Sequence, residues 1–101
     1  MILYNVTSKP DSNIAEAWLQ WMKDEHIPDV LNTNCFTNAT LCKLLEVDDE
    51  EGPTYTVQYH AETHENYQRY INEYAGAMRK KVNEKWGDNI VTFRSLMQIV
   101  H

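Results

Sequence analysis

The most constraining feature of the sequence is the order in which two hydrophobic periodicities follow one another along 101 residues. Apolar residues at helical spacing form two stripes. One stripe is Ile14, Trp18, Met22 and His26, and the other is Tyr67, Ile71, Tyr74, Ala75, Met78, Val82 and Trp86. Segments rich in β-branched and aromatic residues, typical of strands, occur at 2–8, 35–47, 54–61 and 89–100. The order is therefore β-α-β-β-α-β.

This order predicts an α+β fold, the ferredoxin-like plait. Its four-stranded antiparallel sheet carries both helices on one face. The chain has no linker or break in composition, and its length is that of one domain, so residues 1–101 are predicted to form a single domain.

Several residues indicate where these elements end. Asp11 or Ser12 is placed to cap the first helix, and Thr63 the second. Pro28 cannot continue a helical hydrogen-bond ladder, so we expect the first helix to break at Ile27-Pro28. A short helical turn through Val30-Leu31 is then expected, with Pro28 at its first position. The acidic run 48–51 predicts a solvated hairpin tip, and Gly87 is placed to end the second helix.

Charge and composition exclude several classes of partner. The 15 Asp and Glu exceed the 9 Lys and Arg and give a net charge of -6, which disfavours nucleic acid and anionic membranes. The N-terminal sequence does not have the pattern of a signal peptide, and no apolar run is long enough for a membrane span. Cys35 and Cys42 have opposite parity in one predicted strand and therefore cannot pair. We expect reduced thiols and a cytoplasmic protein.

The predicted sheet has exposed edges that favour a homodimer. In this topology the second and fourth strands are the edges, and each is predicted to span roughly 12 residues, twice the usual length. Long apolar edges aggregate unless they are paired or covered. The helix-free face is also predicted to carry apolar side chains, namely Leu3, Phe36, Leu44 and Leu96. Packing two sheets face to face would cover them.

Two groups of residues could form a ligand site between the helices and the sheet. His26 lies on the apolar stripe of the first helix, where it either caps the helix end or acts as a proton-transfer group in a pocket. Aromatic and sulfur-containing side chains could line such a pocket or simply form the core. They are Tyr4, Trp18, Trp21, Met22, Tyr55 and Tyr59.

A third group is predicted to share the helix-free face. Its members are polar, and they could line a chamber inside the dimer or form interface hydrogen bonds. They are Asn5, Thr40, Gln58, His60 and Arg94. The sequence has no CxxC motif, no calcium-loop spacing and no glycine-rich phosphate loop, so we expect neither a metal nor a cofactor.

Three segments resemble a known superfamily. The opening ILYNVT, the segment WLQWMKDEHIPDVLNT and the late FRSLMQIV resemble the dimeric α/β-barrel proteins. This superfamily includes antibiotic-biosynthesis-monooxygenase-like and EthD-like proteins. The likeness is to an uncharacterised bacterial branch, domain of unknown function 4286, and it implies the fold and a homodimer without an established activity.

The resemblance also bears on haem. Relatives that degrade haem use an Asn on the first strand with a Trp and a His on the second helix. Asn5 could match the first of these residues. The second helix, however, has Trp86 only at its end and His64 only in its first turn, so haem degradation is not expected.

Two functions follow from these features. The first is a dimeric barrel that binds a small hydrophobic or aromatic ligand between its helices and its sheet. The alternative is a cofactor-independent monooxygenase or isomerase in which His26 transfers a proton.

Overall fold

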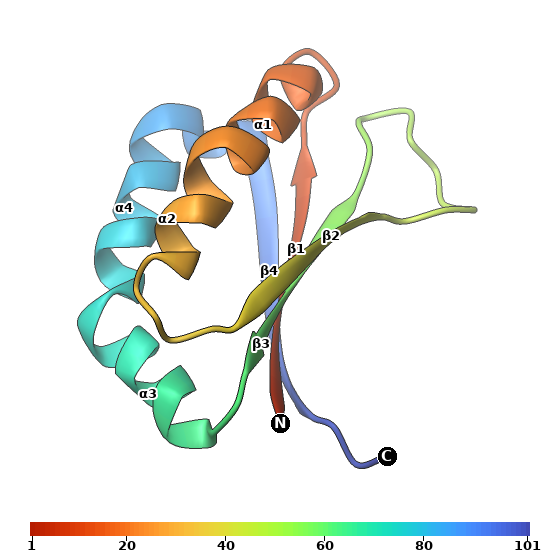
Figure 1. Ribbon diagram of the computed structural model, residues 1–101. Coiled ribbons are helices and arrows are strands. Elements are labelled where there is room, and N and C mark those ends of the chain that lie inside the picture. The colour runs from red at the N-terminus through yellow and green to blue at the C-terminus, as the bar shows by residue number, and fades with distance from the viewer.

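The computed structural model describes residues 1–101 and has four strands in one antiparallel sheet. The strands are β1 (Ile2–Pro10), β2 (Asn38–Lys43), β3 (Tyr55–Ala61) and β4 (Ile90–Gln98), in the order β2-β3-β1-β4. All the helices lie against one face of this sheet, and the other face is uncovered (Figure 1). The ferredoxin-like plait is confirmed, with β2 and β4 at its edges. None of the helices is both long and apolar enough to cross a membrane.

The pairing of β1 with both neighbours determines which residues face the helices. Tyr4 lies opposite Tyr59 of β3 and Leu96 of β4. Because side chains alternate along a strand, the even-numbered residues of β1 and β4 and the odd-numbered residues of β3 share the helix side. Leu3 and its β4 partner Met97 lie on the open face.

The first helical segment runs through Pro28 without the predicted break. It consists of α1 (Ala15–Trp21), a π-helical turn (Met22–His26) and α2 (Ile27–Leu31). In the π turn the N–H of Ile27 donates to the carbonyl of Met22, five residues earlier. This shift places Pro28 in the first turn of α2, where the absence of an N–H is tolerated. The predicted short helix with Pro28 at its start is therefore confirmed.

The predicted cap of this helix is also wrong. The residue before α1 is Ile14, whose side chain caps nothing. The N–H of Ile14 instead donates to the carbonyl of Asp11 at 3.0 Å, so Asp11 and Ser12 lie in a turn that precedes the helix.

The second predicted helix is divided at Tyr74. It forms α3 (His64–Glu73) and α4 (Ala75–Trp86), and the φ of Tyr74 is -125°. Hydrogen bonds continue on both sides of Tyr74, so the division is a kink. The predicted ends are confirmed, since the Thr63 hydroxyl accepts from the N–H of Asn66 at 3.1 Å and Gly87 follows α4 with a φ of 55°.

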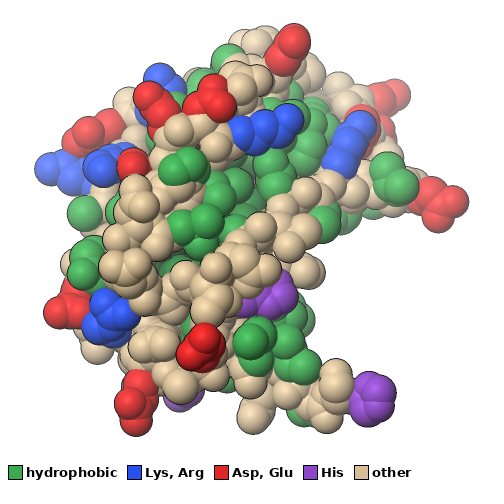
Figure 2. Space-filling view, in the orientation of Figure 1, with side chains coloured by type: hydrophobic (Ala, Val, Ile, Leu, Met, Phe, Trp, Pro, Cys, Tyr) green, Lys and Arg blue, Asp and Glu red, His purple; other side chains and the backbone are tan.

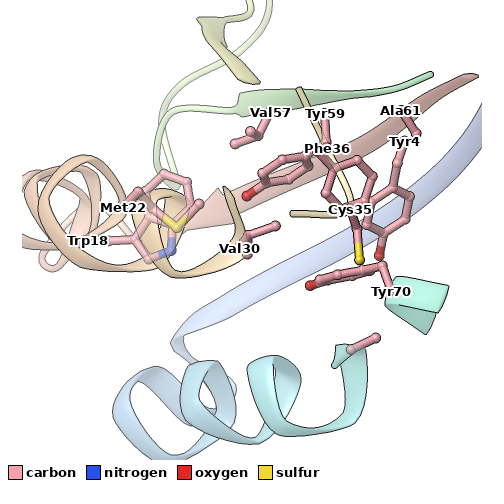
Figure 3. Close-up of a cluster of buried hydrophobic side chains, with 11 residues drawn as sticks. Tyr4, Trp18, Met22, Val30, Cys35, Phe36, Val57, Tyr59, Ala61 and Tyr70 are labelled. Carbon is pink, nitrogen blue, oxygen red and sulfur yellow. The ribbon is translucent and has the colours of Figure 1, made fainter. Parts of the chain in front are cut away.

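The second strand is about half as long as predicted, because β2 begins only at Asn38 and already ends at Lys43. Cys35 and Phe36 precede it and are buried among the helices (Figure 3). Asn34, with a φ of 62°, turns the chain inward at this point. Phe36 is therefore a core residue, and its predicted place on the open face is wrong. Both cysteines are free, with Cys35 buried and Cys42 exposed.

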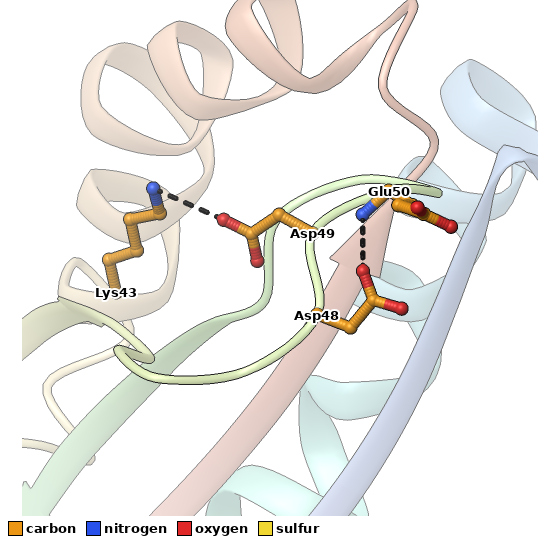
Figure 4. A network of polar contacts seen from close by, with 4 residues as sticks. All are labelled: Lys43, Asp48, Asp49 and Glu50. Atoms are coloured by element: carbon orange, nitrogen blue, oxygen red, sulfur yellow. Dashed lines mark hydrogen bonds and ion pairs between the residues drawn. The ribbon is translucent and has the colours of Figure 1, made fainter.

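The acidic turn between β2 and β3 is exposed, as predicted. Lys43 Nζ lies 3.5 Å from Asp49 Oδ2, and the N–H of Glu50 donates to Asp48 Oδ1 at 2.9 Å (Figure 4). In the space-filling view, acidic side chains project at the hairpin tip, and charged side chains surround the helices (Figure 2). Such exposed pairs contribute little to stability.

Gly52 anchors this hairpin to the end of β1. It is buried, and its φ of 138° is one that L side chains rarely adopt. A Cβ on Gly52 would collide with the backbone carbonyl of Pro10. Gly76 in α4 is the opposite case, because nothing lies within 4 Å of its would-be Cβ.

We therefore expect opposite effects from two glycine substitutions. Gly52→Ala should lower the free energy of unfolding by about 1–3 kcal/mol, because it combines backbone strain with a collision. Gly76→Ala should raise it by about 0.5–1 kcal/mol, because alanine favours the helix. Urea denaturation measures both, and equal stability of the two variants would contradict this account.

Candidate functional site

A cavity of about 40 Å³ lies between the helices and the covered face of the sheet. Every layer of the fold contributes to its wall. The sheet supplies Tyr4, Val6, Ser8, Tyr59, Ile90, Thr92 and Arg94. The first helical segment supplies Trp18, Met22 and His26, and the second supplies Tyr70, Met78, Arg79 and Val82. Nine of these 14 residues are hydrophobic, so the cavity is suited to an apolar group.

Four of the six aromatic or sulfur-containing residues predicted for a pocket lie in this wall, namely Tyr4, Trp18, Met22 and Tyr59. The other two do not line it. The ring of Tyr55 packs against Trp18, with centroids 5.5 Å apart. Trp21 stacks on His26 and meets Trp86 edge to face. Trp21 therefore supports the wall from behind.

The π turn determines where His26 lies. Trp21 and His26 are five residues apart, a spacing that brings side chains together where hydrogen bonds run from i to i+5. Their rings stack with centroids 4.9 Å apart and 21° between planes. The imidazole thus lies between an indole ring and the cavity.

The environment of His26 keeps its imidazole neutral. Burial lowers its pKa from 6.5 to about 4, Asp29 opposes this shift and Lys81 adds to it. Its Nδ1 atom is buried and has no hydrogen-bond partner. The imidazole forms no hydrogen bond with a backbone carbonyl, so it does not act as a helix cap. It is a neutral group with an unused nitrogen beside a cavity.

Tyr59 and Tyr70, two tyrosines of the wall, are held in their protonated form. Burial raises the pKa of Tyr59, and the neighbouring Tyr70 and Tyr4 raise it further. Burial also raises the pKa of Tyr70. Both phenols therefore remain neutral hydrogen-bonding groups at physiological pH.

Two arginines in the wall were missed as cavity residues by the sequence analysis. Arg94 was predicted on the helix-free face, but β-pairing places it opposite Val6, on the helix side. Arg79 was not among the predicted site residues, and its Nη2 donates to the Tyr4 hydroxyl at 3.2 Å. Arg94 and Ile90 are both even-numbered residues of one strand, so their side chains face the same side of the sheet. The pairing of Ile90 with Pro10 identifies this side as the helix side, so knowledge of the register would have placed Arg94 correctly.

The remaining predicted polar residues lie on the open face of the sheet. Gln58 lies between Asn5 and Thr40, and His60 pairs with Leu3. Asn5 Oδ1 is buried without a partner. Beside them apolar side chains are exposed on β4 and just after it, with exposed fractions of 53% for Val91, 67% for Phe93, 40% for Met97 and 39% for Ile99. Leu96, predicted here, lies on the helix side.

The structure contains no group of three or more His, Cys, Asp or Glu side chains that could hold a metal ion.

Comparison with known families and structures gives the following likenesses. The model of the family described as domain of unknown function 4286 (DUF4286) matches residues 1–100. No curated protein matches the chain.

Solved structures match the fold at low sequence identity. A dimeric ferredoxin-like protein from an uncultured marine organism has a TM-score of 0.75 at 8% identity, covering 99% of this chain and 95% of its own. An EthD family protein from Bacillus halodurans has a TM-score of 0.69 at 11% identity, covering 98% and 100%. SnoaB, a cofactor-independent oxygenase from Streptomyces nogalater, has a TM-score of 0.66 at 12% identity, covering 99% and 93%.

The low pKa of His26 predicts that acid destabilises the fold. The unfolded chain takes up this proton near pH 6.5 and the folded chain only near pH 4. The free energy of unfolding should therefore be fully retained above pH 6.5 and decrease as the pH falls toward 4, by roughly 2–3 kcal/mol. Urea denaturation at several pH values measures this slope.

His26→Gln should remove most of this acid sensitivity, because glutamine does not titrate. His101→Gln, at the exposed chain end, is the control and should keep the slope of the unsubstituted protein. An unchanged slope in His26→Gln would show that His26 does not cause the effect.

Proposed function

The chain belongs to the family of domain of unknown function 4286, and we propose that it is a homodimeric α/β-barrel protein that binds a small hydrophobic or aromatic ligand. The ligand occupies the cavity between the helices and the sheet. The observation that carries this proposal is the lining of the cavity, which combines apolar side chains with unpartnered polar atoms. Binding pockets for small molecules have this composition.

The dimer forms through the open face of the sheet. One side of the sheet has no helix over it, and Val91, Phe93 and Met97 of β4 are exposed there, followed by Ile99. Exposed apolar side chains that gather on one face favour a partner. A second copy would cover this surface and give buried Asn5 Oδ1 a partner. The solved structure of a dimeric ferredoxin-like protein with the same fold supports this assembly.

A cytoplasmic location is part of the proposal. The free and exposed thiol of Cys42 supports it, because exposed thiols persist in reducing compartments.

Ligand binding is tested by filling the cavity. Val82→Phe adds a ring to the wall, and we expect it to weaken binding of neutral 2-naphthol about tenfold or more, by loss of space. Val47→Phe makes the same change on the exposed hairpin and should leave binding unchanged. Quenching of tryptophan fluorescence gives the affinities. Equal binding by both variants would place the ligand elsewhere.

Two substitutions test the dimer, and each introduces a negative charge on a different face of strand β4. Phe93→Asp puts a carboxylate on the open face and should yield a monomer near 11.9 kDa. Leu96→Asp introduces the same group on the helix side and should leave the dimer intact. Sedimentation velocity distinguishes the two species. A natural chain that sediments as a monomer at micromolar concentration would exclude the dimer.

A second candidate function is a cofactor-independent monooxygenase or isomerase. The observation that favours it is the neutral imidazole of His26, which reaches the cavity wall with one nitrogen unused. A neutral imidazole is in the protonation state that a general base needs, and burial makes this one a weaker base than a free imidazole. In a screen of phenols and enols, His26→Gln should abolish turnover while 2-naphthol still binds. Turnover that survives this substitution would exclude His26 as the proton acceptor and leave ligand binding as the only proposed function.

A further inference from the structure

The cavity contains positive charge and no negative charge. Its 14 lining residues include Arg79 and Arg94 but no Asp or Glu. The chain as a whole has the opposite balance, with 15 acidic residues and a net charge of -6. Two positively charged side chains therefore lie at one site in a protein that is acidic as a whole.

Neither arginine is paired with a carboxylate of the protein. The three ion pairs in the structure involve Lys43, Lys80 and Lys81. The Arg79 guanidinium donates only to the Tyr4 hydroxyl, and the Arg94 guanidinium makes no hydrogen bond within the chain. Arg69 is different, because it donates to the backbone carbonyls of Thr33 and Asn34 and so has a structural partner.

A third donor in the wall has no acceptor. Trp18 is 1% exposed, lines the cavity and has a buried Nε1 without a partner. An indole N–H can only donate, and leaving a buried donor unpaired is unfavourable. No group of the protein accepts a hydrogen bond from the Trp18 N–H, so an acceptor would have to come from a bound ligand.

The two guanidinium groups act on the same part of the cavity. Both lower the pKa of the Tyr70 hydroxyl, against the larger increases caused by burial and by Tyr4. Arg79 and Arg94 are themselves exposed, whereas Tyr70 is buried. Their charges therefore lie at the opening, beside an apolar interior.

We propose, on the basis of the binding function above, that the ligand is a small aromatic carboxylic acid. Its ring occupies the apolar interior among Val6, Met22 and Val82, and its carboxylate meets Arg79 and Arg94 at the opening. A planar carboxylate matches the guanidinium fork, and such charge-assisted hydrogen bonds are stronger than neutral ones.

The test compares benzoate with benzamide, which has nearly the same shape and no charge. We expect benzoate to bind about tenfold more tightly or better, because only benzoate forms charge-assisted hydrogen bonds. Titration by isothermal calorimetry or by chemical shifts of the cavity residues gives both affinities.

Substitutions identify the source of this preference. Arg94→Met should reduce benzoate affinity about tenfold and leave benzamide affinity unchanged. The side chain of Arg94 makes no hydrogen bond that the substitution would remove, so this variant should fold normally. Lys80→Met is the matched control, because it removes one positive charge next to Arg79 without touching the cavity. It should leave the preference for benzoate intact.

The possible results separate this inference from the function on which it rests. If both compounds and 2-naphthol bind equally well, the binding function stands and the preference for an acid is overturned. If none of the three binds, the ligand-binding function fails together with the inference. If Lys80→Met weakens benzoate as much as Arg94→Met does, general charge attraction replaces recognition by the cavity, and the inference is overturned.

Discussion

The aromatic cluster around Tyr4 holds the two layers of this fold together. Tyr4 is on the central strand β1, and its ring centroid lies 5.3 to 6.1 Å from those of four other rings. These rings belong to Phe36, Tyr59, Tyr67 and Tyr70, which come from the segment before β2, from β3 and from α3. Aromatic pairs at such distances contribute about 0.5–1.5 kcal/mol each beyond the burial of their area. The Tyr4 hydroxyl also binds Arg79, so the same residue links the core to the cavity.

The π turn gives the first helical segment two properties that an α-helix would not combine. It lets the chain pass Pro28 while Ile27 keeps helical angles of -61° and -46°. It also brings Trp21 and His26 into contact, which fixes the imidazole at the cavity wall. Single π turns occur frequently at functional sites, and here the turn orients the one imidazole that the cavity contains.

Strand β4 serves two different surfaces through the alternation of its side chains. Arg94 and Thr92 face the cavity, and Phe93 faces the open side of the sheet. The proposed ligand site and the proposed dimer surface are therefore separated by one strand. A change at either surface can be tested without altering the other, because adjacent residues point in opposite directions.

The sequence alone predicted the order of the elements, the edge positions of β2 and β4 and the ends at Thr63 and Gly87, because periodicity and capping depend on near neighbours. It also placed Tyr4, Trp18, Met22 and Tyr59 correctly on the helix side. Tertiary structure decided the rest. The side of the sheet on which Arg94 lies depends on its register with β1, and the burial of Phe36 depends on a turn at Asn34. The continuity of the helix at Pro28 depends on packing around a π turn, since local preferences favour a break there. These features arise from contacts between residues distant in sequence, which local patterns do not encode.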